Sequence, residues 1–524
     1  MIALELVLDL DQADNETVRC YIAAHRLGVP VSQITAVRVR KRSLDARGKA
    51  VKVRLQAEVY VNEAAPTDDL PRPAYPPVNS NRTVVVVGGG PAGMFAALRL
   101  IELGIKPIVL ERGKNVQARR RDLAAINRRG VVDPNSNYCF GEGGAGTYSD
   151  GKLYTRATKR GNVEEVLKTL VAHGAPPDIL IEAHPHIGSN RLPKVVQAMR
   201  QSILGAGGEI RFNTRVVDFL LEDHHNRRIC GVVTANGEAI YGEAVILATG
   251  HSARDVFALC AVRGIRLEAK PFAMGVRIEH PQPLIDRIQY HHPTRDSRLP
   301  AAAYRLATTV QERGVFSFCM CPGGWIVPSA TAPDEVVVNG MSLSRRDSPF
   351  ANSGMVVGIE PIDLEPYTQH GALAGIAYQE SLEQMAAEAG GGAQRAPGQR
   401  LTDFLVNRTS STLPACSYQP GLNPAPLHEL LPAPLAQRLQ DGLRTFGQTM
   451  RGYVTEEAVI VGVESRTSSP VRLPRDPHTL QHVEVRGLYP CGEGAGYAGG
   501  IISAAMDGLR TAEACAAVEC STSV

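Results

Sequence analysis

The fold is decided by one stretch, Thr83-Val84-Val85-Val86-Val87-Gly88-Gly89-Gly90-Pro91-Ala92-Gly93. Four consecutive valines are typical of a buried parallel strand. Gly88 permits a tight turn, Gly90 lets the backbone approach a phosphate, and Gly93 lets the next helix pack on the strand. The start of that helix offers unpaired N–H groups and the positive end of its dipole to an anion. The pattern therefore predicts a Rossmann-type fold that binds a dinucleotide.

A second strand and an acidic residue follow in the order that this fold requires. Pro107–Leu110 is predicted to be a strand, and Glu111 comes directly after it. This acid lies roughly 20 residues after the glycines, where a ribose hydroxyl needs an acceptor. Strand, glycines, helix, strand and acid in this register are a stronger signal than a lone glycine motif. They do not distinguish FAD from NAD.

Two later segments carry further features of a nucleotide-binding fold. Ala244–Leu247 is predicted to be a buried strand, and Thr249-Gly250 follows it. Near the other end of the chain, Gly487–Gly494 is predicted to be a strand followed by a glycine and an acid, Gly492-Glu493. The pair Gly499-Gly500 then opens an alanine-rich helix. Together with the first stretch, these segments resemble the flavoproteins of the glutathione-reductase-2 type, in which one dinucleotide fold is assembled from both ends of the chain.

This resemblance implies that the cofactor is FAD. It covers residues 82–255 and 456–520. It implies that the acid at Glu493 binds the ribityl or pyrophosphate part of FAD. The helix that opens at Gly500 would point its positive end at the N1/C2=O edge of the flavin. The physical chemistry agrees, because reduced flavin carries negative charge at that edge and a helix N-terminus stabilises an anion.

A closer resemblance covers nearly the whole chain. Five segments are similar to signatures of the bacterial and plastid "FAD-dependent dehydrogenase" family, whose substrates are largely unassigned. The resemblance implies a fold and a cofactor rather than a particular reaction. The five segments are Gly141–Leu153, Gly250–Asp255, Gly275–Pro281, Cys319–Gly324, and Arg345–Ser348 with Ala351–Ser353.

Cofactor contacts are expected on both halves of the fold. Gly143 and Gly144 are predicted to lie in a loop over the flavin, where glycine lets the backbone approach a flat ring; a surface loop is the alternative. The complete set of expected FAD contacts is Gly88, Gly90, Pro91, Ala92, Gly93, Glu111, Arg112, Gly143, Gly144, Val216, Thr249, Gly250, Gly492, Glu493, Gly500 and Ile501.

Cys319 and Cys321 are candidate catalytic residues. They are two apart on a predicted strand, so their side chains should share one face, with Phe316, Phe318 and Met320 on the opposite face. Two interpretations are open. The cysteines form a redox dithiol or a pair of thiol ligands, or they are two small buried residues. A disulfide closed across a single residue is strained, which favours the second interpretation.

His251 and Arg345 are the remaining catalytic candidates. His251 follows a strand end that faces the ligand crevice, so it contacts flavin or substrate, or else makes a structural hydrogen bond. Arginine is the usual partner of carboxylates, so a group of arginines in the middle of the chain suggests an anionic substrate. That group is Arg277, Arg305, Arg345 and Arg346.

The composition is that of an ordinary globular enzyme. Hydrophobic residues make up 44% and charged residues 21%, and the net charge of +3 does not suggest nucleic acid as a partner. No apolar run is long enough to span a membrane, and the N-terminus does not resemble a secretory signal. Ten scattered cysteines fit a reducing cytoplasm. No Cys or His group has the spacing of metal ligands, so no metal site is expected.

The chain is expected to be an α/β protein with three parts. Residues 1–75 are predicted to form a ferredoxin-like α+β module, of strand–helix–strand–strand order, that ends in a proline-rich linker and could bind a protein partner. Residues 82–255 and 456–524 are predicted to form a discontinuous FAD-binding domain. Residues 256–455 are predicted to be an inserted α+β substrate or cap domain.

The expected function is that of an FAD-dependent oxidoreductase that transfers a hydride through flavin N5 to or from a small organic substrate. No second G-x-G-x-x-G motif with a following acid is visible, so no dedicated NAD(P) domain is expected. Two alternatives remain open. One is a flavin monooxygenase that uses NAD(P)H as a transient electron donor. The other is a non-catalytic FAD-bound protein for electron transfer or binding.

Overall fold

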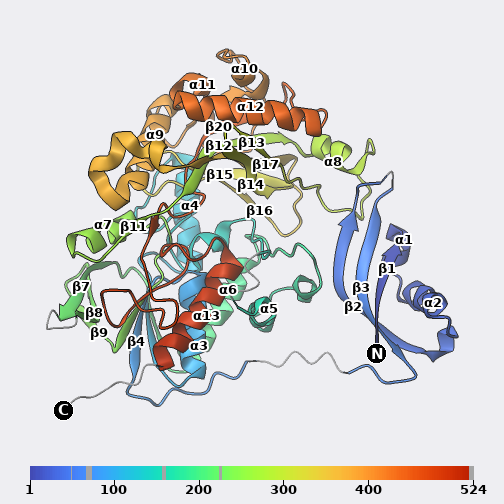
Figure 1. Ribbon diagram of the computed structural model, residues 1–524, viewed down its shortest axis with the longest axis horizontal. Coiled ribbons are helices and arrows are strands. Elements are labelled where there is room, and N and C mark those ends of the chain that lie inside the picture. Colours follow the sequence, from blue (N-terminus) through green and yellow to red (C-terminus); the bar gives the residue numbers. More distant parts are fainter. Residues whose placement is uncertain (49, 67–72, 156–160, 223–226, 518–524) are drawn as a thin grey trace.

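The computed structural model describes residues 1–48, 50–66, 73–155, 161–222 and 227–517. The described strands form six sheets, three of which set the main arrangement (Figure 1). A small N-terminal sheet lies to the right in the view, a parallel sheet lies at the lower left, and a seven-stranded sheet with its helices lies above. No helix of the described residues is long and apolar enough to cross a membrane.

The N-terminal residues form a separate three-stranded antiparallel sheet of order β1-β3-β2. The predicted order of strand, helix, strand and strand is confirmed. A third strand placed between the first two is the arrangement of one half of a ferredoxin-like fold. The sheet and α2 enclose their own apolar core. The elements are β1 (Ile2–Leu8), α1 (Leu10–Ala13), α2 (Glu16–Leu27), η1 (Val31–Gln33), β2 (Ile34–Asp45) and β3 (Lys52–Val61).

The predicted proline-rich linker follows this sheet. Residues 67–72 of it lie outside the described residues. Residues 73–82 contain no helix or strand, as expected because proline lacks the N–H that such elements need. Val78 donates its N–H to the carbonyl of Ala206, so this end of the linker is attached to the body.

A five-stranded parallel sheet of order β22-β10-β4-β5-β6 carries the glycine-rich stretch. Its outer strand β22 comes from the far end of the chain. So does the helix α13, which packs on α3 (Figure 1). The predicted assembly of one sheet from both ends of the chain is therefore confirmed. The strands are β4 (Thr83–Val87), β5 (Lys106–Leu110), β6 (Glu209–Arg211), β10 (Ala244–Leu247) and β22 (Leu488–Pro490).

Helices and a small antiparallel sheet surround the parallel sheet. The small sheet, of order β7-β8-β9, contains β7 (Val216–Glu222), β8 (Arg228–Thr234) and β9 (Ala239–Tyr241). The helices are α3 (Pro91–Glu102), α4 (Val116–Arg129), η2 (Gly144–Tyr148), α5 (Val163–Ala172), η4 (Pro177–Leu180), α6 (Leu192–Gly205), α7 (Arg254–Val262) and α13 (Ile501–Ala517).

A seven-stranded sheet of order β13-β14-β17-β12-β20-β18-β19 forms the second large layer. Helix α12 covers its outer face (Figure 1). The strands are β12 (Phe272–Pro281), β13 (Ala307–Val310), β14 (Arg313–Cys321), β17 (Phe350–Ile359), β18 (Ala396–Arg400), β19 (Leu422–Pro424) and β20 (Val459–Glu464). The helices are α8 (Gln282–Tyr290), η5 (Pro361–Leu373), α9 (Ala374–Gly390), α10 (Leu401–Leu405), α11 (Leu427–Leu430) and α12 (Ala433–Thr449).

Two expectations about this region need correction. The boundary predicted at residues 455/456 falls before β20, yet β20 pairs with β12 and β18 inside the seven-stranded sheet. The sequence also predicts mostly helical or irregular structure for residues 367–455, so the short strands β18 and β19 differ from that expectation. Their sequences contain Pro397, Gly398 and Pro424, which mask a strand pattern because they are rare inside sheets.

The turn at Pro322-Gly323 also differs from the expectation. The sequence predicts that Pro322-Gly323-Gly324 is a turn between two antiparallel strands, Val315–Cys321 and Trp325–Val327. The chain does turn there, but β14 pairs with β13 and β17, whereas β15 (Gly324–Pro328) pairs with β16 (Val338–Ser342) in a separate hairpin. The turn therefore passes the chain from one sheet to another. β11 (Glu268–Ala269) and β21 (Val471–Arg472) form a separate antiparallel pair.

Candidate functional site

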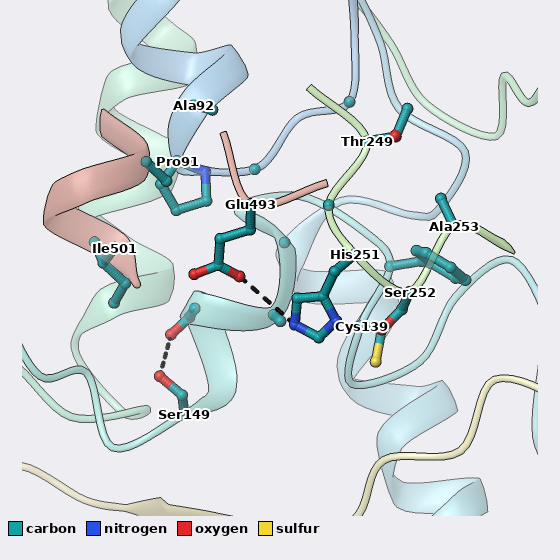
Figure 2. A pocket seen from close by; sticks show the side chains of 18 of the residues that line it. Pro91, Ala92, Cys139, Ser149, Thr249, His251, Ser252, Ala253, Glu493 and Ile501 are labelled. Atoms are coloured by element: carbon teal, nitrogen blue, oxygen red, sulfur yellow. Dashed lines mark hydrogen bonds and ion pairs between the residues drawn. The ribbon is translucent and has the colours of Figure 1, made fainter. Parts of the chain in front are cut away.

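One cavity extends from the parallel sheet to the seven-stranded sheet. It lies at the carboxyl ends of β4, β5 and β10, and residues of β14 and β16 line its other side. Figure 2 shows Pro91 and Ile501, each at the start of a helix, on one side of Glu493, and His251 on the other. In doubly wound sheets, ligands bind in crevices at these strand ends.

The turn after β4 requires glycine at two positions. Gly88 has φ of 108°, in the region that favours glycine, and a Cβ there would lie 2.4 Å from the carbonyl oxygen of Ala248. A Cβ at Gly93 would lie 1.9 Å from the carbonyl oxygen of Gly88. Helix α3 therefore packs directly on the turn, and the packing roles predicted for Gly88 and Gly93 are confirmed.

The start of α3 faces this cavity without a side-chain cap. Gly90 is the N-cap residue, and Pro91 and Ala92 begin the helix and line the cavity. The first N–H groups of a helix have no partner within the helix. They offer hydrogen bonds and a positive dipole end to a phosphate.

Two glycines of the cavity wall are not required by the packing or the backbone angles of the chain. Their lack of a side chain instead fits the close approach of a bound dinucleotide. Gly90 has φ of −77°, which any residue adopts, and a Cβ there would meet only the Cα of Gly144, at 3.8 Å. Gly499 is not among the residues with positive φ, and a Cβ there would meet no atom of the described chain within 4 Å. The backbone at both positions borders open space, as expected where a ligand approaches the chain closely.

Glu111 lies at the wall, but its carboxylate already binds three loops. Oε2 accepts the N–H of Gly89 at 2.8 Å, and Oε1 accepts the N–H groups of Gly113 and Gly141 at 2.9 Å each. The residue is only 4% exposed. A carboxylate has about four acceptor positions, so one is left for a ribose hydroxyl. The sequence indicated that Glu111 binds a ribose, but it did not indicate that its carboxylate also holds three backbone N–H groups in place.

Arg112 and Val216 line the cavity next to Glu111. The guanidinium of Arg112 binds Asp255 at 2.9 Å and lies over the ring of Phe140, 4.2 Å from its centroid. These contacts fix the position of the arginine at the cavity wall.

The glycine loop that was predicted to cover the flavin divides into two parts. Gly144 lines the cavity, together with Ala145 and Gly146. Gly143 does not line it. Its N–H donates to the carbonyl of Gly89 at 2.8 Å, and a Cβ there would lie 2.0 Å from Oγ1 of Thr147. Gly143 therefore supports the loop, and the part that follows Gly143 faces the cavity.

Glu493 and His251 approach each other across the cavity (Figure 2). His251 Nε2 lies 3.6 Å from Glu493 Oε2. Burial, reinforced by Arg466 and Arg254, lowers the pKa of His251 to about 4, so the ring is neutral at pH 7. Burial raises the pKa of Glu493, and the N–H of Gly500, which the carboxylate accepts, opposes this shift.

Residues of β14 form the opposite wall, where the predicted alternation fails. Cys319 and Cys321 both line the cavity, but so does Phe318, which was expected on the other face. The register of β14 against β17 shifts between Phe318 and Cys321, and Cys319 has φ of 43°. This β-bulge interrupts the two-residue period of the strand. Cys319 is exposed to the cavity, whereas Cys321 is buried.

A cluster of charged side chains lies beside the cysteines and was not among the site residues predicted from the sequence. Asp150 and Lys152 line the cavity, and the carboxylate of Asp150 binds Lys152 at 3.2 Å and Arg346 at 2.5 Å. Burial alone would raise the pKa of Asp150, but the two cations hold it well below its usual range. Asp150-Gly151-Lys152 lies within Gly141–Leu153, one of the segments similar to the dehydrogenase family, and that similarity was the available signal.

Arg345, the last catalytic candidate, is exposed and does not line the cavity. Its neighbour Arg346 is the residue that binds Asp150. Two adjacent arginines in a turn point in different directions, and the sequence does not show which of them points inward.

The cavity brings together most, but not all, of the predicted site residues. Gly93, Gly143, Gly492 and Arg345 do not line it. Gly492 instead donates its N–H to Asp507 at 2.8 Å. The predicted residues that line it are Gly88, Gly90, Pro91, Ala92, Glu111, Arg112, Gly144, Val216, Thr249, Gly250, His251, Cys319, Cys321, Glu493, Gly500 and Ile501. No group of three or more potential metal ligands is found among the residues with described positions.

Family models match most of the chain. One described as "FAD-dependent protein, C-terminal domain-like" matches residues 271–467. "FAD dependent oxidoreductase" matches residues 152–327, and "FAD binding domain" matches residues 81–128. A domain of unknown function matches residues 1–60. The chain is therefore an FAD-dependent oxidoreductase.

A protein of Clostridium beijerinckii, described only as uncharacterized, is 43% identical over 433 residues. The match covers 82% of this chain and 80% of that protein. At this identity and coverage, the chain belongs to one family with the clostridial protein.

The solved structures that match are more distant in sequence. CtdE in complex with FAD is 11% identical, with a TM-score of 0.31 over 83% of this chain and 84% of that chain. A geranylgeranyl bacteriochlorophyll reductase-like protein from Thermoplasma acidophilum is 13% identical, with a TM-score of 0.33 over 83% of this chain and 78% of that chain.

Proposed function

We propose that FAD lies along this cavity and that the enzyme transfers a hydride through flavin N5 to or from a small organic substrate. The pyrophosphate would lie at Gly90 and the start of α3, and the adenosine ribose at Glu111. The isoalloxazine ring would lie toward Gly144–Gly146, His251 and Ile501. The observation that carries the proposal is the open space beside Gly90 and Gly499, two glycines that the chain itself does not require.

The substrate would bind between the flavin and β14. FAD supplies the two-electron chemistry when bound. The chain supplies a wall with the Cys319 thiol, the phenyl ring of Phe318 and the ammonium group of Lys152. Lys152 and Arg346 bring two positive charges against the single negative charge of Asp150. This excess of positive charge supports an anionic substrate, such as a carboxylate.

His251 would act as a neutral hydrogen-bonding group toward flavin or substrate. Its lowered pKa keeps it uncharged near pH 7. Glu493 would hold the ribityl or pyrophosphate part of FAD from the other side of the cavity. NAD(P)H is proposed as a transient electron donor.

Acid precipitation of the purified yellow protein tests the cofactor. FAD should appear in the supernatant, since the proposed contacts are non-covalent. A colourless protein that takes up no FAD on reconstitution would contradict the proposal.

Stopped-flow spectroscopy separates the reaction classes. Reduction by NAD(P)H or a metabolite mixture, followed by mixing with oxygen or a quinone, should show slow reoxidation by oxygen and fast reoxidation by the quinone. A C4a-hydroperoxide signal would indicate a monooxygenase instead. Reduction without turnover of any organic substrate would indicate an electron-transfer protein.

A further inference from the structure

Cys319 and Cys321 lie in the same cavity wall as the residues proposed to contact the flavin ring. The β-bulge of β14 produces this arrangement, because the left-handed backbone at Cys319 departs from regular strand geometry. A residue held in such a conformation has a free-energy cost that the surrounding structure must offset, and such residues gather at functional sites.

A hydrogen bond joins the two cysteines. The thiol of Cys321 donates to the carbonyl oxygen of Cys319 at 3.2 Å, so its sulfur is folded back against that residue. Cys319 is exposed to the cavity, and a ligand or a second thiol can reach it there. Both sulfurs are free thiols in this structure.

A buried arginine fixes this pair. Nη2 of Arg277 binds the carbonyl of Cys319 at 2.8 Å and lies 3.5 Å from Sγ of Cys321. Glu464 at 2.7 Å and Asn352 at 2.8 Å hold the same guanidinium, which is fully buried. Lys152 adds a second cation, since its ammonium donates to the carbonyl of Met320.

Removal from bulk water keeps both thiols protonated, although Cys319 can be reached from the cavity and Cys321 is buried. This desolvation raises the pKa of Cys319 to about 12 and also raises that of Cys321, while Lys152 and Arg277 act in the opposite direction. A dithiol and a disulfide are both neutral, so burial disfavours neither resting form. A thiolate formed during exchange would face the two cations.

We propose that Cys319 and Cys321 form a redox couple that exchanges an electron pair with the bound flavin. In one direction the two S–H bonds break, an Sγ–Sγ bond forms, and two electrons and two protons pass to oxidised FAD, which becomes reduced. In the other direction, reduced FAD returns them and the disulfide opens. A bridge closed across one residue is strained, and strained disulfides are easily reduced and serve catalytic or regulatory roles. The inference depends on the proposed FAD site.

The thiol state can be read without any substrate. Trypsin should release residues 314–345, which contain no cysteine other than Cys319 and Cys321. The FAD-loaded protein is reduced anaerobically with dithionite or reoxidised with air, denatured in N-ethylmaleimide and digested. We expect two maleimides on this peptide from the reduced protein. From the oxidised protein we expect none, with the peptide lighter by two hydrogens.

Electron counting gives a second readout. Complete bleaching of the flavin should consume two electron pairs per protein in the wild type, and one in Cys319→Ser or Cys321→Ser. Cys139→Ser is the matched control, because Cys139 also lines the cavity but has no neighbouring thiol in the sequence. This variant should still consume two pairs.

Two results would overturn the inference, and they differ. If FAD is bound but the oxidised protein gives two maleimides and consumes one electron pair, the couple is absent while the cofactor site stands. If no FAD is released by acid, the proposed function fails and the couple has no flavin to serve. The peptide assay on the wild type shows whether the two cysteines form a disulfide, even if a serine variant does not fold.

Discussion

At the scale of single residues, the glycines of the turn after β4 serve two different purposes. One is close packing within the chain, and the other is space for a ligand. Gly93 is glycine because the chain has no room for a Cβ there. Gly90 has ordinary backbone angles and a clear space beside it. We therefore expect Gly90→Ala to fold normally and to lose FAD affinity by about tenfold or more, roughly 1.4 kcal/mol, because the added methyl group makes only an ordinary contact with the Cα of Gly144 and otherwise meets the ligand.

Gly93→Ala is the matched comparison. Its methyl group would collide with the carbonyl of Gly88, so the unfolding midpoint of the protein without FAD should fall clearly below that of the wild type. Thermal unfolding of both variants and an FAD titration check these results. If Gly90→Ala retains wild-type affinity, the pyrophosphate does not lie where we place it.

Glu111 gives a second prediction. In Glu111→Gln the carboxamide retains one acceptor oxygen, and its NH2 group faces an N–H donor. Each charge-assisted hydrogen bond that is lost costs about 1.5–3 kcal/mol, so the protein should become less stable in urea even without FAD. FAD affinity should also fall.

The exposed Glu484 provides the control for this change, and Glu484→Gln should unfold like the wild type. A Glu111→Gln protein that loses FAD affinity with no loss of apo stability would show that the three backbone contacts contribute little.

His280 determines part of the response to acid. It is fully buried, and Nε2 donates to the carbonyl of Tyr453 at 2.8 Å. Burial lowers its pKa from 6.5 to about 4. As the pH falls from 6.5 to 4, the unfolded chain binds the proton first, so stability on the order of 3 kcal/mol is lost across this range.

His280→Gln should therefore lose less stability than the wild type between pH 7 and pH 4. Urea unfolding at several pH values in this range measures the difference. Equal losses in both proteins would show that His280 does not titrate below its unfolded value.

At the scale of elements, the regular strands and helices could be predicted because their side-chain period is local. The four valines of β4 and the helical spacing of Glu16–Leu27 each indicated their element directly. The β-bulge at Cys319 could not be predicted in this way, because a bulge depends on the partner strand β17 and not on the sequence of β14. Phe318 consequently entered the cavity wall against expectation.

The local sequence also does not show to which sheet a strand belongs. β20 is a buried apolar strand whichever sheet receives it, and only its pairing with β12 and β18 assigns it to the seven-stranded layer. The candidate site shows the same pattern. Contacts close to a motif, such as those of Gly88 and Gly90, could be expected. The arrangement of Asp150, Lys152 and Arg346 joins segments almost 200 residues apart and could not.

At the scale of the whole molecule, the N-terminal sheet has its own core but is also attached to the body. Arg42 donates its N–H to the carbonyl of Ile181 at 2.7 Å, accepts that of Ala183 at 2.9 Å, and binds Glu182 through its side chain. Asp11 binds Arg298 across the same boundary. Apolar packing accompanies these polar contacts, because Leu10, Ala46 and Val51 pack against the large core.

We expect a chain that begins at Asn79 to be soluble and to retain FAD, with a lowered unfolding temperature. The flavin contacts proposed above all lie beyond residue 79. FAD content after gel filtration and a thermal melt test this expectation, with the full-length protein as reference.

If the shortened chain keeps FAD but loses turnover with an identified substrate, residues 1–75 serve the active site or a partner. If the shortened chain is insoluble, these residues belong to the main core, and the prediction that they form a separate module is wrong.

The assembly of the parallel sheet from both ends of the chain also sets an order of events during synthesis. The turn at Gly88–Gly93 leaves the ribosome first, but β22 and α13 follow about 400 residues later, on the order of tens of seconds at ~5–20 residues per second. Until then α3 has no α13 to cover it, and Glu493 and Gly500 do not yet exist. A nascent chain would therefore be unable to retain FAD until translation is nearly finished, and one stalled before residue 488 should be found without flavin.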